Sequence, residues 1–162
     1  MKKILVLFAV MMSLHASAND TTKLYNPIAN VAKDVIEVVK KARKENKQVL
    51  IQVGGNWCIW CYRFNDFLES DKELKEIIEK DYIVYHLNYS KENKNLVYLK
   101  KLGFPQRFGF PVFVILNKDG QVIHTQDSGL LEDGKQSYNK DKVKTFLQNW
   151  STEAFNESNY KE

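Results

Sequence analysis

Cysteine is scarce in this chain of 162 residues, in which Cys58 and Cys61 are the only two. Every argument about thiols therefore concerns this one pair. A lone structural disulfide is plausible in a protein outside the cytoplasm. A bridge that closes a loop of only two residues, however, constrains the unfolded chain very little. The pair is poorly suited to a purely structural role.

The chain also lacks an excess of one charge. It has 24 Lys and Arg against 20 Asp and Glu, and two of these lysines, Lys2 and Lys3, precede an N-terminal apolar run. This balance argues against a strongly charged partner such as a nucleic acid. The basic run from Lys40 to Lys44 is accordingly interpreted as the solvated last turn of a helix.

Long apolar runs are absent as well. The run from Ile4 to Leu14 is shorter than the stretch of about 20 residues that a membrane-spanning helix needs. It follows two lysines and precedes Ala16-Ser17-Ala18, a small-x-small pattern typical of a signal-peptidase site. We therefore predict a signal peptide over residues 1–18 that is cleaved after Ala18. An uncleaved N-terminal anchor is the alternative.

Beyond this leader, no segment is apolar enough to cross a bilayer, and the residue directly after the cleavage site is Asn19, not a cysteine that could carry a lipid. We expect a protein that is secreted across the inner membrane, is not membrane-embedded and resides in the periplasm of a didermal bacterium. The length suits one domain, without repeats or linkers. We assign residues 19–47 to an N-terminal segment and helix, 48–150 to the principal domain and 151–162 to a flexible tail.

Within these bounds, apolar periodicity predicts helices that alternate with strands. A first helix is expected over 27–46, with Asn26 as its cap and Pro27 at its first position. Ser70 to Glu73 has the spacing of a capping box for a helix to about Lys80. Other helices are expected from the cysteines to about Glu69, around Leu96–Leu102 before Gly103, and after the cap Asn139. Strands are expected at 48–53, 82–89, 112–116 and 121–125, the last two joined by the turn at 117–120. This order indicates an α/β protein with a mixed sheet and helices on both faces.

The stretch from Val49 to Cys61 organises this pattern. A short apolar run, which reads as a fully buried strand, stops at Gly54 and Gly55, and the two cysteines follow. Two intervening residues allow both sulfurs to share the first turn of a helix. Unpaired N–H groups and the positive dipole end at a helix N-terminus would stabilise a thiolate at Cys58. Because a thiolate attacks disulfides and a second thiol resolves the product, the pattern carries a redox mechanism.

Other uses of the pair fit less well. Haem attachment requires histidine after the second cysteine, where this chain has Tyr62. Structural zinc requires four ligands, which only His86 and His124 could complete, and these lie on separate predicted strands. We therefore expect no metal and no cofactor, and His86 is interpreted as an ordinary strand residue. An inert pair of thiols is the remaining alternative.

At this point the sequence resembles the thioredoxin superfamily. The resemblance rests on Val49–Cys61, which combines a strand, a short turn and Trp-Cys-x-x-Cys, and on Gly109 to Val114 before the hairpin. It covers roughly residues 48–150. The closer resemblance is to secreted bacterial thioredoxin-like proteins with an extra N-terminal helix and a Trp-Cys-x-Trp-Cys centre. It also resembles the periplasmic electron-accepting domain of the Dsb-type membrane thiol transporter.

The resemblance implies a thioredoxin-like fold in which Cys58 is the exposed nucleophile and Cys61 the buried resolving thiol. It also implies that Pro111 is cis and packs opposite the disulfide, which exposes the backbone of Phe110 for pairing with a substrate chain. Phe110 would then help to form the rim of the binding groove. We expect Trp57 to shield the disulfide and Trp60 to face the substrate. Arg63 is interpreted as a solvated helix residue.

Two positions depart from the family pattern. Gln52 stands where thioredoxins usually carry a buried acid, and Asn65 stands where the transporter domain has a second one. A buried carboxylate can relay the proton that leaves the resolving thiol, whereas an amide does not ionise. Either Asp66, water or another group takes this part, or thiol exchange is slower than in thioredoxin.

These observations predict an exported, monomeric thiol–disulfide oxidoreductase that acts on protein dithiols and disulfides and favours reduction. A periplasmic reductase would need a membrane electron donor. The alternatives are a non-catalytic binding module that uses the groove around Trp60 and Phe110, and a carrier for one client such as apocytochrome thiols.

Overall fold

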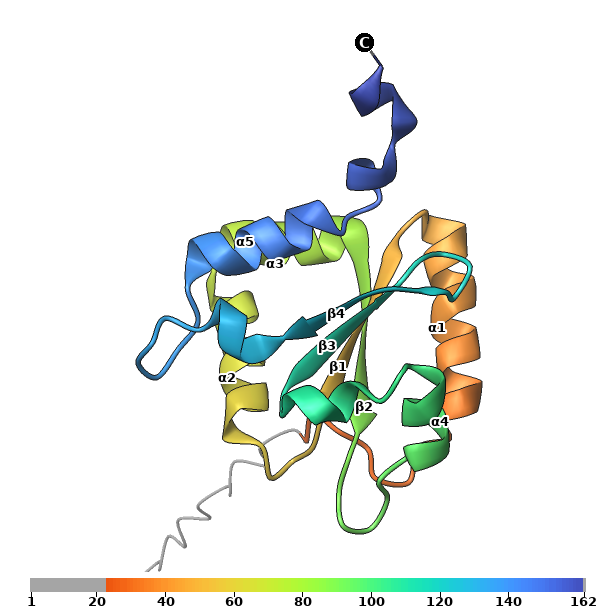
Figure 1. Ribbon diagram of the computed structural model, residues 1–162, viewed down its shortest axis with the longest axis vertical. Helices are drawn as coiled ribbons and strands as arrows, with labels where there is room; N and C mark the ends of the chain where they lie inside the picture. Colours follow the sequence, from red (N-terminus) through yellow and green to blue (C-terminus); the bar gives the residue numbers. More distant parts are fainter. Residues whose placement is uncertain (1–22, 162) are drawn as a thin grey trace, which may run out of the picture.

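The computed structural model describes residues 23–161, so the predicted signal peptide lies outside the described residues. The secondary structure alternates between helices and strands, as Figure 1 shows. The elements are α1 (Val31–Glu45), β1 (Gln48–Gly54), α2 (Ile59–Ser70), α3 (Lys72–Asp81), β2 (Tyr82–Asn88), α4 (Leu96–Lys101), β3 (Val112–Leu116), β4 (Val122–Asp127) and α5 (Lys140–Asn149). Short 3-10 helices cover Pro105–Phe108, Ser128–Leu131, Glu153–Phe155 and Glu157–Tyr160.

The strands form one mixed sheet in the order β2-β1-β3-β4. β1 pairs in parallel with β2 and antiparallel with β3, and β3 and β4 form an antiparallel hairpin. Every residue of the central strand β1 is buried, which confirms the prediction of a strand covered on both faces. The predicted α/β architecture with a central mixed sheet is therefore confirmed.

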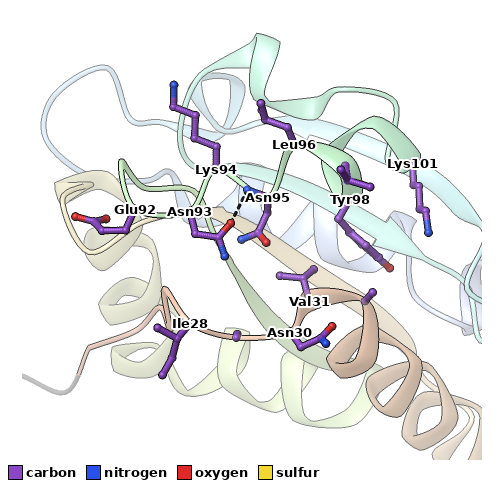
Figure 2. A pocket seen from close by; sticks show the side chains of 13 residues that line it. Ile28, Asn30, Val31, Glu92, Asn93, Lys94, Asn95, Leu96, Tyr98 and Lys101 are labelled. Atoms are coloured by element: carbon purple, nitrogen blue, oxygen red, sulfur yellow. Dashed lines mark hydrogen bonds between the residues drawn. The ribbon is translucent and has the colours of Figure 1, made fainter.

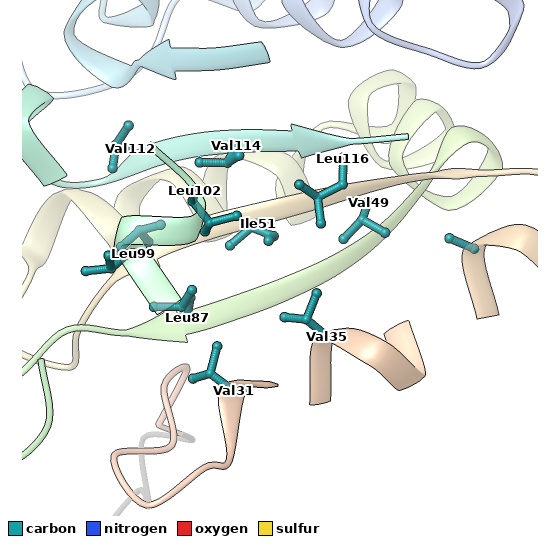
Figure 3. Close-up of a cluster of buried hydrophobic side chains, with 12 residues drawn as sticks. Val31, Val35, Val49, Ile51, Leu87, Leu99, Leu102, Val112, Val114 and Leu116 are labelled. Carbon is teal, nitrogen blue, oxygen red and sulfur yellow. The ribbon is translucent and has the colours of Figure 1, made fainter. Parts of the chain in front are cut away.

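Helices cover both faces of this sheet (Figure 1). Side chains of α1 and α4 pack on the face that carries Val49, Ile51 and Val53, and Figure 3 shows this apolar layer. The opposite face carries Leu50 and packs against α2, α3 and α5. Alternate residues of a strand point to opposite faces, so Gln52 shares the face of Leu50 and points towards α2.

The first helix begins later than the sequence predicts. Asn30, rather than Asn26, caps α1 by accepting a hydrogen bond from the Lys33 N–H at 3.1 Å. Asn26 and Pro27 instead begin a turn, in which the Asn26 side chain accepts from the Ile28 N–H at 3.1 Å. Ile28, which the helical pattern placed on the apolar face, is 91% exposed. The segment before Asn30 is therefore not helical, and it passes the end of the sheet before α1 begins.

The cap of α3 is also shifted by one residue. Asp71 accepts hydrogen bonds from the Glu73 and Leu74 N–H groups, whereas Ser70 is the last residue of α2. A carboxylate is a stronger acceptor for these N–H groups than a hydroxyl, which explains the displacement. The cap at Asn139 and the position of Gly103 after α4 are as predicted.

The C-terminal segment differs from the central domain. After Ser151 the chain forms two short 3-10 helices in place of a regular helix, and this segment extends away from the sheet in Figure 1. Its flexibility stays a prediction. Within residues 23–161, no helix combines the length and apolar character that crossing a bilayer requires.

Candidate active site

The two cysteines lie where β1 passes into α2. β1 ends at Gly54, and Cys58 is the N-cap residue of α2, with extended backbone angles. Its sulfur accepts a hydrogen bond from the Cys61 N–H at 3.2 Å. The two sulfurs are joined in a disulfide, with their Cα atoms 5.3 Å apart. The predicted position of the pair, at a helix N-terminus and within bonding distance, is therefore confirmed.

The disulfide is more enclosed than the sequence predicts. Cys58, expected to be exposed, is only 4% accessible, and Cys61 is fully buried. Both belong to a small buried cluster with Tyr25, against which Trp60 and Phe110 also pack. The remaining accessible surface of the pair belongs to Cys58, and its role as the attacking thiol stays a prediction.

Aromatic side chains form one wall beside the disulfide. The Trp57 indole N–H donates to the Tyr89 carbonyl at 2.7 Å, and its ring meets the Phe110 ring edge-on at 5.3 Å between centroids. The Phe110–Pro111 peptide bond is cis, as the family resemblance implied. Trp57 remains 57% exposed, so it borders the site and presents an apolar face to solvent. Whether these residues bind substrate stays a prediction.

Trp60 also packs against the disulfide cluster and is half-buried. Its ring packs edge-on against Tyr138 at 5.7 Å, and the Arg63 guanidinium stacks over it at 4.7 Å. The Tyr138 hydroxyl donates to the Trp60 carbonyl at 3.2 Å. Trp60 is therefore held in place by the loop before α5, and Arg63, predicted to be solvated, is half-buried over the Trp60 ring.

Behind the disulfide, the position of the usual family acid is occupied by a buried amide. Gln52 is 2% exposed, and its Nε2 donates to the Tyr25 hydroxyl at 2.8 Å and to the Cys61 carbonyl at 3.1 Å. Burial raises the pKa of Tyr25 far above its ordinary value, although the Gln52 hydrogen bond partly opposes this. Tyr25 is therefore a neutral hydroxyl at every physiological pH.

An asparagine in the turn before the cysteines holds Tyr25 there. The Asn56 side chain accepts from the Tyr25 N–H at 3.0 Å and donates to the Tyr25 carbonyl at 2.8 Å. Its Oδ1 also accepts from the Tyr62 hydroxyl at 3.0 Å. One amide thus satisfies both backbone groups of Tyr25 in the manner of a strand partner.

The N-terminal segment has a second attachment at the loop between β2 and α4. Asn93 donates from its side chain to the Pro27 carbonyl at 3.1 Å. Figure 2 shows Asn93 and Asn95 of this loop across a hollow from Ile28 and Asn30. No local sequence pattern singles out Tyr25, Asn56 or Asn93, because these contacts join residues more than 30 positions apart.

The remaining polar residues near the site are placed as follows. Asp66 is exposed, and it lies five residues after Cys61 on α2, so it faces away from the buried sulfur. Gln52, Asn65 and His86 line a cavity of about 120 Å³ beside the cluster. Burial lowers the pKa of His86, so this imidazole is neutral at pH 7. Across residues 23–161, no three His, Cys, Asp or Glu side chains gather in a group suited to a metal ion.

Comparison with a thioredoxin-like family profile gives a match over residues 30–118, more than half of the chain. The chain belongs to the thioredoxin-like family. The matched part contains both cysteines and the cis proline, whereas Tyr25 precedes it. No curated protein matches the chain.

Solved structures agree with this fold. A disulphide isomerase from Xylella fastidiosa Temecula1 is similar with a TM-score of 0.66 and 23% identity, over 76% of this chain and 93% of that one. The C-terminal domain of DsbD from Neisseria meningitidis, in its oxidised form, gives a TM-score of 0.52 and 18% identity over 75% and 97% of the chains. A thioredoxin from Thermus thermophilus gives 0.50 and 17% over 75% and 84%. A thioredoxin fold that carries a CxxC disulfide is consistent with thiol–disulfide oxidoreductase chemistry.

Proposed function

We propose that this thioredoxin-like protein is an exported thiol–disulfide oxidoreductase that acts on protein substrates in the periplasm, as a monomer, mainly as a reductant. The observation that supports this most directly is the Cys58–Cys61 disulfide at the N-terminus of α2. The Cys61 N–H points at the Cys58 sulfur, and this hydrogen bond favours a thiolate once the bridge is reduced.

In the reductive direction, the Cys58 thiolate attacks one sulfur of a substrate disulfide. A mixed disulfide forms, and the other substrate sulfur leaves as a thiolate that takes up a proton. The Cys61 sulfur, after losing its proton, then attacks the Cys58 sulfur and releases the second substrate thiol. Two electrons pass to the substrate, and the protein is left with the disulfide seen in the structure.

The surface beside Cys58 suits an extended polypeptide. Trp57 and Ile59, on either side of Cys58, are 57% and 60% exposed, so the entrance is apolar. Phe110 precedes the cis proline and packs against the disulfide cluster. We assign the backbone of Phe110 and the rings of Trp57 and Trp60 to substrate binding. Return of the protein to the dithiol form requires a reductant, for which a membrane thiol donor is the proposed class.

Trapping of mixed disulfides tests the proposal. Cys61→Ser leaves the attacking thiol without its resolving partner, so covalent complexes with client proteins should accumulate and should disappear on treatment with dithiothreitol. Cys58→Ser is the matched control, because it keeps one thiol but removes the attacking one. Equal trapping by both variants, or by neither, would contradict the assignment.

Two further measurements separate the finer alternatives. A double Cys→Ala variant that retains full biological function would identify a binding module instead of an enzyme. Equilibration with glutathione gives the direction, because thioredoxin has a potential of about −270 mV and a strong oxidant about −120 mV. A value near the first supports the reductase, and a value near the second overturns that part of the proposal.

A further inference from the structure

In the resolving step, Cys61 must attack as a thiolate, although its surroundings favour the neutral thiol. Cys61 is fully buried, and burial favours the neutral thiol over the thiolate that must attack Cys58. The residue at the usual position of a buried acid is Gln52, which does not ionise. A hydrogen-bond donor near this sulfur would favour the thiolate.

Tyr25 is the polar side chain that the fold brings to this sulfur. Gly54 lies between them: a Cβ atom at this position would be 2.7 Å from the Tyr25 hydroxyl oxygen and closer still to the Cys61 sulfur. The Tyr25 hydroxyl oxygen and the Cys61 sulfur thus both lie next to the space that a side chain at position 54 would fill, and only glycine leaves that space empty. Tyr25, Cys58 and Cys61 also form one buried cluster, and Tyr25 is 1% exposed.

The hydrogen bonds of Gln52 determine what the Tyr25 hydroxyl is free to do. The Gln52 amide lies beside the Cys61 carbonyl, which accepts hydrogen bonds only, so the nitrogen must face it. The same nitrogen donates to Tyr25, whose oxygen is therefore an acceptor in that bond. The hydroxyl proton is left to point elsewhere, and Cys61 is its neighbour. The raised pKa of Tyr25 keeps this proton in place throughout the physiological range.

We propose that the Tyr25 hydroxyl donates a hydrogen bond to the Cys61 thiolate and thereby favours the resolving step at a site where Gln52 replaces the usual buried acid. This inference rests on the proposed oxidoreductase function. Tyr25 acts as a donor and not as a base: its proton stays on the hydroxyl. The proton that Cys61 loses passes to the departing substrate thiolate or to solvent, and the Cys61 electron pair forms the bond to the Cys58 sulfur.

Other ionisable groups around the cluster do not supply this donor. The Tyr62 hydroxyl is bonded to Asn56, and the Tyr138 hydroxyl to the Trp60 carbonyl. His86 meets the Tyr25 ring edge-on at 5.4 Å and lines the neighbouring cavity. The charged side chains that line this cavity come from α2 and α3, namely Glu69, Lys75 and Glu79. Arg63 lies over the Trp60 ring.

Direct measurement of Cys61 ionisation tests the inference. In the full-length Cys58→Ser protein, Cys61 is the only thiol, and its 13Cβ chemical shift reports its ionisation as pH is raised. A hydrogen bond to a charged group contributes enough that Tyr25→Phe should move this ionisation upward by about one to two pH units. Tyr82→Phe is the matched control. This buried hydroxyl donates to the Leu147 carbonyl, and Tyr82 begins β2 beside Gln48, at the end of β1 away from Gly54 and the cysteines.

A kinetic readout follows from the same shift. In the protein with both cysteines, Tyr25→Phe should slow resolution of a preformed mixed disulfide at pH 7 by about 3- to 10-fold. The fraction of thiolate falls by more than this, but a more basic thiolate is a better nucleophile, which partly compensates for the loss. The rate should recover as pH is raised, which a purely structural defect would not do.

The outcomes are distinct. An upward shift with Tyr25→Phe and none with Tyr82→Phe supports the inference. Unchanged ionisation in Tyr25→Phe, an equal shift in both variants, or a larger shift with His86→Gln overturns it. The proposed function is judged separately by the Cys61→Ser trap. If Cys61→Ser traps clients but Tyr25→Phe leaves the Cys61 ionisation unchanged, only the proposed hydrogen bond from Tyr25 is rejected. If Tyr25→Phe shifts the ionisation but no client is trapped, only the proposed oxidoreductase function is rejected.

Discussion

Asn56 connects the N-terminal segment to the cysteine loop, and its replacement by alanine has a calculable result. The change removes two hydrogen bonds to the Tyr25 backbone, at 3.0 and 2.8 Å, and one from the Tyr62 hydroxyl. A net hydrogen bond contributes about 0.5–1.5 kcal/mol. The two backbone bonds together should therefore hold the segment by about 1–3 kcal/mol. Tyr62 is half-buried and can turn to water, so its bond adds little.

Amide hydrogen exchange measures this quantity at the residue concerned. The Tyr25 N–H is bonded to Asn56, so its exchange reports opening of this contact. A loss of 1–3 kcal/mol corresponds to exchange faster by about 5- to 150-fold. Amides in the centre of β1, which no Asn56 bond protects, should change far less. Urea titration of the same variant should show only part of the loss, because local opening does not require global unfolding.

Asn56→Asp serves as the graded control. A carboxylate still accepts from the Tyr25 N–H and the Tyr62 hydroxyl but no longer donates to the Tyr25 carbonyl. Its effect on exchange should lie between wild type and Asn56→Ala. Asn56→Ala should also raise the pKa of the Cys61 thiol, as we expect for Tyr25→Phe. Tyr25 exchange at the wild-type rate in Asn56→Ala would refute the view that this side chain holds the segment.

Two other predictions concern the same cluster. Gly54→Ala places a Cβ atom against the Cys61 sulfur and 2.7 Å from the Tyr25 hydroxyl oxygen, so overpacking should lower the free energy of unfolding by about 1–3 kcal/mol. Urea titration against Gly129→Ala, where the nearest atom is a carboxylate oxygen of the half-buried Asp127 at 3.3 Å, checks this; equal stability of the two variants would contradict it. Burial lowers the pKa of His86 below 6.5, so the unfolded chain binds this proton more tightly. Stability should therefore fall as pH drops below 6.5 towards the folded-state value. His86→Gln should flatten the pH dependence of the urea midpoint over about pH 5 to 7.5, the range in which histidine titrates. An unchanged pH dependence in this variant would show that other groups cause it.

Local chemistry was sufficient to predict most of the framework. The apolar run of β1 is a fully buried strand and the β-branched and aromatic run of β2 a buried to half-buried one, and the predicted bounds hold to within a residue or two. The turn after β3 forms where its Gly120 adopts a positive φ. The cysteine pair lies at a helix N-terminus because two glycines end the preceding strand. These features depend on neighbours in the chain, and so the pattern of residues carried them.

The sequence was a weaker guide where two polar groups competed for one position. Asn26-Pro27 and Asn30 are both plausible starts of α1, and only the contacts of the N-terminal segment with Asn56 and Asn93 select the later one. Ser70 and Asp71 likewise compete to cap α3. The enclosure of Cys58 arises from residues of three separate segments, which no local pattern reports.

The sequence by itself determined that two thiols would share the start of a helix behind a buried strand, because spacing and apolar periodicity act over a few residues. The resemblance to the thioredoxin superfamily also placed Gln52 where a buried acid is usual. Only the tertiary structure decided what stands in its place, because Tyr25 reaches the Cys61 sulfur through contacts that span 27 to 31 positions of the chain. Such contacts are created by the packing of the N-terminal segment over the end of the sheet, and they exist only once the sheet has formed.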